Sequence, residues 1–340
     1  MKRIQASIGT VLIASSMLGQ VSPFNGLEPL GPDSTGHWRV VIGGHFHGSS
    51  NSRSGYPAAT LLASLDAINA TGAHLLLSTG DLFLDREADI PRYERAFFSK
   101  LAMPLYNVPG NHDQGMPGYV ERFGPTYGLL RLGTTSVLLL DTERDNGDIR
   151  GEQMRMLGDL ADDDDMTALL IIAHRPLWAE DDPRYTDLFK GNTRSTLRTN
   201  YRKEVAPLLE RIARRVPVHW ISGSMAGLAP ASIFFERHAD NIIFIQSAIR
   251  DEARDAVLVA DIGPAGINWQ GLSLTGVELM PVEAYDAAWW RARMKRTEPF
   301  RWRLLPMHVK NAVTHRFFWW GAAAALVLSL LFRLLLRRGT

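Results

Sequence analysis

The sequence predicts an α/β fold built on mixed β-sheets with helices between the strands. Short apolar runs alternate with stretches of helical periodicity, a hairpin pattern at 131–137 indicates antiparallel pairing, and the end of this region is rich in strands. The expected helices are 57–70, 92–101, 151–160 and 201–215. The expected strands are 38–44, 74–79, 103–108, 137–140, 168–173, 216–222, 232–235, 242–246 and 256–262.

The composition limits the classes of protein to which the chain can belong. The chain has 340 residues, 46% of them hydrophobic, which is enough for one large domain or two small ones. Its net charge is +1, so nothing in the composition indicates nucleic-acid binding. The absence of cysteine excludes disulfides, thiolate metal ligands and a cysteine nucleophile.

Several apolar runs end in polar residues of the kinds that bind metal ions. The run 103–108 leads through Pro109 and Gly110 into Asn111, His112 and Asp113. An amide oxygen, an imidazole and a carboxylate at one strand end can bind a metal ion and move a proton. Three other runs lead in the same way into His45 and His47, into Gly80 and Asp81, and into His174.

This order of motifs resembles the calcineurin-like metallophosphoesterase superfamily over about residues 36–270. The resemblance implies a four-layer sandwich, with two stacked mixed β-sheets flanked by helices and the site at the strand ends. It implies that Asp81 bridges two divalent metal ions (Mn, Fe or Zn), with His45 and His47 facing one ion and Asn111 and His174 the other. It further implies that His112 gives a proton to the leaving oxygen, that Asp113 orients His112, and that Arg175 contacts a phosphate-ester substrate.

The sequence departs from the family pattern at three positions. His45 stands in place of an aspartate, and Ser224 and Ala226 stand in place of the two histidines of the last motif. We therefore expect one or two metal ions bound with reduced affinity. A nearby His219 cannot substitute, because at ~3.3 Å per residue it lies ~16 Å from that strand end. We interpret Asp85 as a helix N-cap and leave the position of His238 open.

Two functional hypotheses follow. The first is a membrane-anchored phosphoesterase that hydrolyses phosphate mono- or diesters at a metal centre with fewer protein ligands than the family pattern has. The second is a catalytically inactive relative that serves as a binding or scaffold protein. The retained ligands favour the first hypothesis because unpaired buried polar groups are costly. The lost histidines of the last motif favour the second.

The two ends of the chain suggest a membrane location. Residues 1–24 resemble a secretory signal, residues 25–36 read as a linker, and 36–275 form the phosphoesterase-like domain. A basic aromatic segment, 280–316, precedes an apolar run at 317–336 that is long enough for a transmembrane helix. Lys2 and Arg3 favour an extracytoplasmic domain, periplasmic or at the cell surface, whereas the basic residues of 291–316 favour the opposite orientation.

Overall fold

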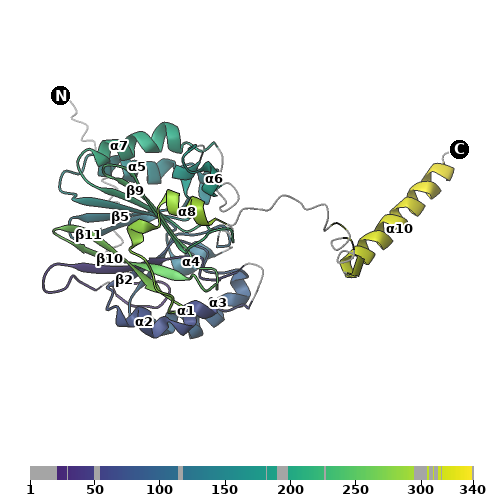
Figure 1. Ribbon diagram of the computed structural model, residues 1–340, viewed down its shortest axis with the longest axis horizontal. Helices are drawn as coiled ribbons and strands as arrows, with labels where there is room; N and C mark the ends of the chain where they lie inside the picture. Colours follow the sequence, from purple (N-terminus) through teal and green to yellow (C-terminus); the bar gives the residue numbers. More distant parts are fainter. Residues whose placement is uncertain are drawn as a thin grey trace, which may run out of the picture. The chain divides into compact units, whose positions relative to one another are not determined.

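Two β-sheets lie face to face, with helices on their outer sides (Figure 1). The computed structural model describes residues 21–28, 30–49, 54–113, 118–180, 182–189, 198–225, 227–294, 305, 309, 313–314 and 316–338. Its two compact units are residues 1–295 and 296–340, and each is described by itself. The predicted arrangement of two mixed sheets flanked by helices is confirmed for the first unit.

The first sheet carries three of the predicted ligand-bearing strands side by side. Its order is β11-β10-β1-β2-β3, with β1, β2 and β3 parallel to one another. The carboxyl ends of parallel strands meet at one edge, so the residues that follow these three strands are brought together. The strands are β1 (Trp38–Gly43), β2 (Leu75–Ser78), β3 (Leu105–Asn107), β10 (Ala256–Gly263) and β11 (Gly266–Ser273).

The second sheet supplies the other two motif positions. Its order is β4-β5-β6-β7-β9-β8, with β5, β6, β7 and β9 parallel. The predicted hairpin is confirmed as the antiparallel pair β4 and β5. The strands are β4 (Gly128–Leu132), β5 (Thr135–Leu140), β6 (Ala168–Ala173), β7 (Val218–Ser222), β8 (Ile233–Ala239) and β9 (Ile242–Ser247).

Alternating side chains of the central strands enter two separate hydrophobic cores. Val40 and Ile42 of β1 belong to the core between the sheets, whereas Val41 belongs to the core under the outer helices. On β2, Leu77 likewise belongs to the core between the sheets, and Leu76 belongs to the core under the outer helices. Burial on both faces explains why these strands read as continuous apolar runs in the sequence.

The helices differ from the sequence prediction at their boundaries. The helix predicted at 57–70 is interrupted at Ser64, whose hydroxyl donates to the carbonyl of Leu274. The helix predicted at 92–101 begins earlier because Asp85 caps it, accepting from the N–H of Ala88. The predicted helix 201–215 opens with a π-helical turn, Tyr201–Val205. The helices are α1 (Ala59–Ala63), α2 (Leu65–Ala70), α3 (Arg86–Ala96), α4 (Tyr119–Phe123), α5 (Gly151–Ala161), α6 (Thr186–Phe189) and α7 (Ala206–Ala213).

Parts of the predicted flanking segments pack into the first unit. Ser22 is buried and its hydroxyl donates to the carbonyl of Leu105, while Phe24 stacks on Phe123. At the other end, helix α8 (Ala287–Arg293) places Trp290 in the core, where its indole N–H donates to Ile233. The first part of the basic aromatic segment therefore belongs to the domain. Residues 1–20, which hold most of the predicted signal, lie outside the described residues.

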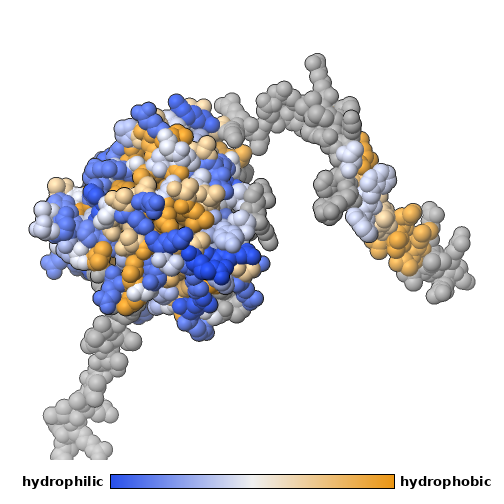
Figure 2. Space-filling model, turned by 90° about the horizontal axis from the view of Figure 1, so that it is seen from below, coloured by the Kyte–Doolittle hydropathy of each residue, from blue (hydrophilic) through white to orange (hydrophobic). Residues whose placement is uncertain are grey.

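The second unit contains helix α10, Arg316–Arg338, over the predicted apolar run. Its described side chains are mostly apolar, as the colouring in Figure 2 shows, and they include the exposed Trp319, Trp320 and Leu328. Among the residues that the structure describes, however, no helix has both the length and the apolar character needed to cross a membrane. The predicted transmembrane helix is therefore not supported.

The buried His219 gives a prediction for the pH dependence of stability. It lies between the sheets on β7, 4% exposed, with its ring 5.4 Å from that of Trp269 and Nδ1 without a partner. Burial lowers the pKa of His219 to about 4. Because its pKa in the unfolded chain is about 6.5, the stabilisation is complete above pH 6.5 and is lost as the pH falls toward 4.

We expect this residue alone to remove about 2 kcal/mol between pH 7.5 and pH 5. Urea unfolding of the wild type and of His219→Phe at both pH values isolates the effect. The variant should lose less stability on acidification than the wild type. An equal loss in both proteins would contradict the assignment.

Candidate metal centre

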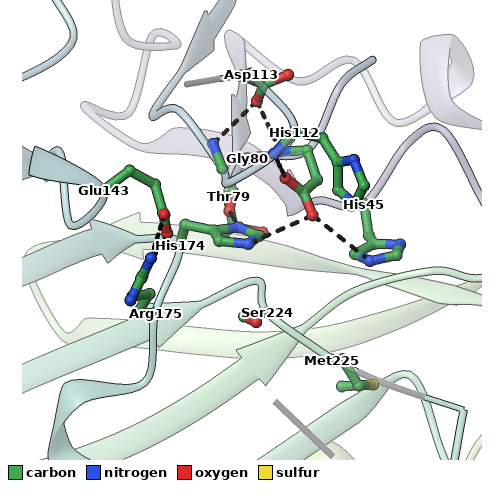
Figure 3. Close-up of polar contacts among 12 residues, drawn as sticks. His45, Thr79, Gly80, His112, Asp113, Glu143, His174, Arg175, Ser224 and Met225 are labelled. Carbon is green, nitrogen blue, oxygen red and sulfur yellow. Dashed lines mark hydrogen bonds and ion pairs between the residues drawn. The ribbon is translucent and has the colours of Figure 1, made fainter. Parts of the chain in front are cut away.

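The ligand-bearing residues begin where β1, β2, β3 and β6 end, and the fold brings them to one place (Figure 3). His45 and Asp81 both adopt left-handed backbone conformations, with φ of 60° and 59°. Such a conformation costs a non-glycine residue about 1–3 kcal/mol and persists only where the surroundings enforce it. Here the N–H of His45 donates to the carbonyl of Gly80 at 2.8 Å, which joins the two turns.

One carboxylate oxygen of Asp81 lies among three imidazoles. The distances from Asp81 Oδ2 to the Nε2 atoms are 3.6 Å for His45, 3.7 Å for His47 and 3.4 Å for His174. His45, His47 and Asp81 can offer ligand atoms that all lie within 4.8 Å of one another. His174 approaches the same oxygen from the other side (Figure 3). Asp81 thus has the position expected of a shared ligand between two groups of residues.

Hydrogen bonds fix the tautomers of two of these histidines. Nδ1 of His45 lies 3.1 Å from the carbonyl of Gly48, and Nδ1 of His174 lies 2.9 Å from the carbonyl of Thr79. A carbonyl can only accept, so each Nδ1 carries a proton and each ring presents its Nε2 to Asp81. A main-chain partner of this kind is typical of metal-binding histidines.

The electrostatics of the cluster favour a charged carboxylate at Asp81 beside a neutral ring of His45. Burial, with a contribution from His47, lowers the pKa of His45 well below its usual value. Burial acts to raise the pKa of Asp81, but the imidazoles of His174, His47 and His45 outweigh it and hold that pKa well below its usual range. A divalent cation between the imidazole nitrogens and this carboxylate would stabilise the arrangement.

The residues present fit a divalent metal ion. Nδ1 and Nε2 of His47 and Nε2 of His174 are buried and have no hydrogen-bond partner, and such groups are costly unless a ligand satisfies them. Two atoms that share a metal at about 2.0–2.2 Å lie roughly 3.0–3.5 Å apart, within a few tenths of the observed separations. Imidazole and carboxylate ligands suit Zn, Fe and Mn.

Asp113 holds the turn that carries Asp81. Its Oδ1 accepts from the N–H groups of Leu82 and Phe83, and its Oδ2 accepts from those of Asp81 and Gly110 at 2.8 and 3.0 Å. Burial and the adjacent charge of Asp81 raise the pKa of Asp113 to about 6. These main-chain bonds show that Asp113 fixes the backbone of the turn that carries Asp81, and its expected role in orienting His112 stays a prediction.

His112 and Asn111 follow β3 at the rim of the cluster. The ring of His112 lies 4.9 Å from that of His47, and the N–H of His112 donates to Asp81 Oδ1 at 2.9 Å. Both His112 and Asn111 are half-buried. His112 is therefore adjacent to the metal ligands, as the proposed proton donor must be.

Arg175, expected to contact a phosphate, is engaged by another residue. Its Nε donates to Glu143 Oε1 at 2.6 Å and its Nη2 donates to Glu143 Oε2, and the side chain of Glu143 is 1% exposed. This paired geometry is the strong form of an arginine–carboxylate contact. Glu143 was missed in the sequence because it lies 32 residues away; its only signal is its place just after the run 137–140.

The last motif lies against the site without supplying imidazoles. The N–H groups of Gly223 and Ser224 both donate to the carbonyl of His174, so Ser224 lies beside the ligands (Figure 3). Ala226 lies outside the described residues. His238 contacts Arg184 and Tyr185 at the far end of β8, so it does not replace the missing ligands.

The sequence motifs also gave no indication of Arg250, which lies in the loop after strand β9.

Residues 54–193 match the family described as calcineurin-like phosphoesterase. The resemblance seen in the sequence motifs is confirmed over this range. No curated protein matches the chain.

Solved structures show distant similarity. A dimetal phosphatase from Danio rerio is 11% identical, with 72% of this chain and 98% of that chain covered and a TM-score of 0.49. GAP50, the anchor in the inner membrane complex of Plasmodium, is 11% identical, with 78% and 97% covered and a TM-score of 0.46. Vps29 from Entamoeba histolytica in complex with zinc is 12% identical, with 69% and 99% covered and a TM-score of 0.31. These similarities are too low to transfer an activity.

The geometry predicts that Asp81 is the main determinant of metal affinity. Replacing it by Asn removes the charge shared by three imidazoles, and the affinity for Mn²⁺ or Zn²⁺ should fall by about 100-fold or more. Calorimetric titration of the metal-free protein measures this change. Asp85→Asn is the matched control, because Asn is an equally good N-cap and Asp85 faces helix α3. Equal affinities for the two variants would contradict the assignment.

Proposed function

We propose that this chain, whose residues 54–193 match the calcineurin-like phosphoesterase family, is a metal-dependent hydrolase of phosphate mono- or diesters. The observation that carries the proposal is the carboxylate of Asp81 beside three buried imidazoles, two of which, His47 and His174, have an Nε2 without a hydrogen-bond partner. A purely structural cluster gains nothing from this arrangement, because unpaired buried polar groups cost free energy.

Different residues of the chain would bind the metal ions and transfer the proton. His45, His47 and Asp81 would hold one divalent ion, and His174 with Asn111 would face a second position on the other side of Asp81. A divalent ion there would supply Lewis-acid stabilisation of the charge that develops on a phosphoryl group. Asp113 keeps the turn of Asp81 in place through its main-chain hydrogen bonds.

His112 would act as the general acid. Its ring lies at the edge of the cluster, next to that of His47, and it is half-buried. A proton carried there can pass to the leaving oxygen of an ester bound at the metal ligands. Arg175, held by Glu143, is better suited to shape the wall of the site than to clamp a phosphate.

The alternative is a binding or scaffold protein that has lost catalysis. It is favoured by Ser224, which occupies the position of a histidine ligand and is a poor ligand for these metals. Metal content and activity separate the two functions: the scaffold would bind no metal and hydrolyse no ester.

The role of His112 gives the test of the hydrolase. The purified domain, loaded with Mn²⁺, should hydrolyse nitrophenyl phosphate esters, and His112→Ala should lower kcat with unchanged metal content. The loss should be about 10²–10⁴-fold for alkyl esters and smaller for nitrophenyl esters, whose leaving groups need no proton. An equal loss for both substrates would mean that His112 positions the ester. No hydrolysis by the metal-loaded wild type would refute the proposal.

The extracytoplasmic location expected from the sequence stays a prediction. Fractionation of the full chain and of a chain ending at Val309 tests whether the C-terminal part attaches the domain to a membrane. Only the full chain should pellet with membranes. Recovery of both proteins in the soluble fraction would contradict the prediction.

A further inference from the structure

Two arginines lie beside the degenerate last motif, in a place where the sequence pattern assigns no function. Arg250 and Arg254 belong to the loop between β9 and β10, and their side chains are 11% and 15% exposed. Burying two cations near each other is unfavourable unless anionic groups compensate them. The hydrogen bonds and ion pairs of the two arginines show how much of their charge is compensated.

The partners of these arginines are mostly main-chain carbonyls. Arg250 Nη1 donates to the carbonyl of Met225 at 3.2 Å, and Arg254 Nη1 donates to that of Ala231 at 2.7 Å. Arg254 Nη1 also lies 3.6 Å from the sulfur of Met225. Both guanidinium groups therefore gather around Met225, which directly follows Ser224.

A single side-chain carboxylate serves both arginines. Glu252 accepts from Arg254 Nε at 2.8 Å through Oε2, and its Oε1 lies 3.5 Å from Arg250 Nε. Glu252 is 39% exposed, so it can move away into solvent. Arg250 Nε and Arg254 Nη2 are buried and have no hydrogen-bond partner.

The buried Asp255 acts on Arg250 through its charge, while its own hydrogen bonds go to main-chain N–H groups and hydroxyls. Its Oδ1 accepts from the main-chain N–H of Arg250, and its Oδ2 accepts from the N–H of Glu252 and the hydroxyl of Thr60. These bonds fix the backbone of the loop, and among the described residues Glu252 supplies the side-chain carboxylate that pairs with the guanidinium groups. The two guanidinium groups thus share one partly exposed carboxylate, and two of their nitrogen atoms have no hydrogen-bond partner.

The pair borders the metal ligands. The N–H of Ile249 donates to the carbonyl of Gly44, which ties the start of this loop to the turn of His45. On the other side, Met225 continues from Ser224 next to the metal centre (Figure 3).

We propose that Arg250 and Arg254 form an anion site that receives the phosphoryl group of the ligand at the edge of the metal centre. The proposal rests on the proposed function for its substrate class. Guanidinium groups bind phosphate through paired hydrogen bonds and keep their charge at any physiological pH. Fixed cations here would balance phosphoryl charge on the side where the last motif has lost its metal-ligating histidines, and the anion would displace Glu252.

The test uses inorganic phosphate and the metal-free protein, so that it does not depend on catalysis. Phosphate should raise the melting temperature of the wild type above that in chloride of equal ionic strength, because a ligand of the folded state stabilises it. Calorimetry gives the Kd directly. Arg250→Met and Arg254→Met should each weaken phosphate binding at least tenfold, and Arg250→Lys should recover part of it.

Two further variants distinguish phosphate binding by the two arginines from a purely structural role. Arg237→Met, at an exposed arginine of β8 whose Nη1 donates to the carbonyl of Asp240, should bind phosphate like the wild type. Glu252→Gln removes the competing carboxylate and should bind phosphate several-fold more tightly. If the arginines only support carbonyl groups, their loss lowers the melting temperature without changing its response to phosphate, and Glu252→Gln brings no gain.

Failure of the proposal is distinguishable from failure of the hydrolase. A wild type that shows no response to phosphate, or an unchanged response in Arg250→Met, would overturn the anion site. Active Arg250→Met enzyme with unchanged KM would also overturn it and leave the hydrolase standing. Phosphate binding that depends on both arginines in a protein without esterase activity would support the anion site and count against the hydrolase.

Discussion

The contact between Asp81 and three buried imidazoles is the interaction on which the organisation of this domain depends. Every ligand in it comes from a loop at the end of a parallel strand, and each strand lies in one of two stacked sheets. The main-chain carbonyls of Gly48 and Thr79 orient two of the rings so that their Nε2 atoms face the carboxylate. A divalent cation would satisfy these buried atoms, so folding and metal binding should be coupled.

The strain of the ligand turns is compensated by a second buried carboxylate. His45 and Asp81 hold left-handed backbone conformations that cost about 1–3 kcal/mol each. Asp113 offsets this cost by accepting main-chain N–H groups of the Asp81 turn, and charge-assisted hydrogen bonds of this kind are stronger than neutral ones. Asp255 acts in the same way, because its carboxylate accepts main-chain N–H groups and so organises the loop of Arg250 and Arg254.

The strands and the polar motifs at their ends were readable from the sequence, since both are local signals. The two sheets, the hairpin of β4 and β5 and the N-cap at Asp85 are confirmed. The partners of the polar side chains were not readable, because they depend on long-range packing: Glu143 holds Arg175 across 32 residues, and Met225 meets Arg250 across 25. Burial of Trp290 was hidden for a similar reason, since its basic neighbours resemble a surface segment.

The most direct test of the central claim is anomalous diffraction from a crystal of the domain grown with Mn²⁺ or Zn²⁺. An anomalous peak is predicted about 2.0–2.2 Å from His45 Nε2, His47 Nε2 and Asp81 Oδ2, with any second peak on the side of His174. A crystal with metal in the mother liquor but no peak at Asp81, and with the imidazoles still turned toward its carboxylate, would contradict the account.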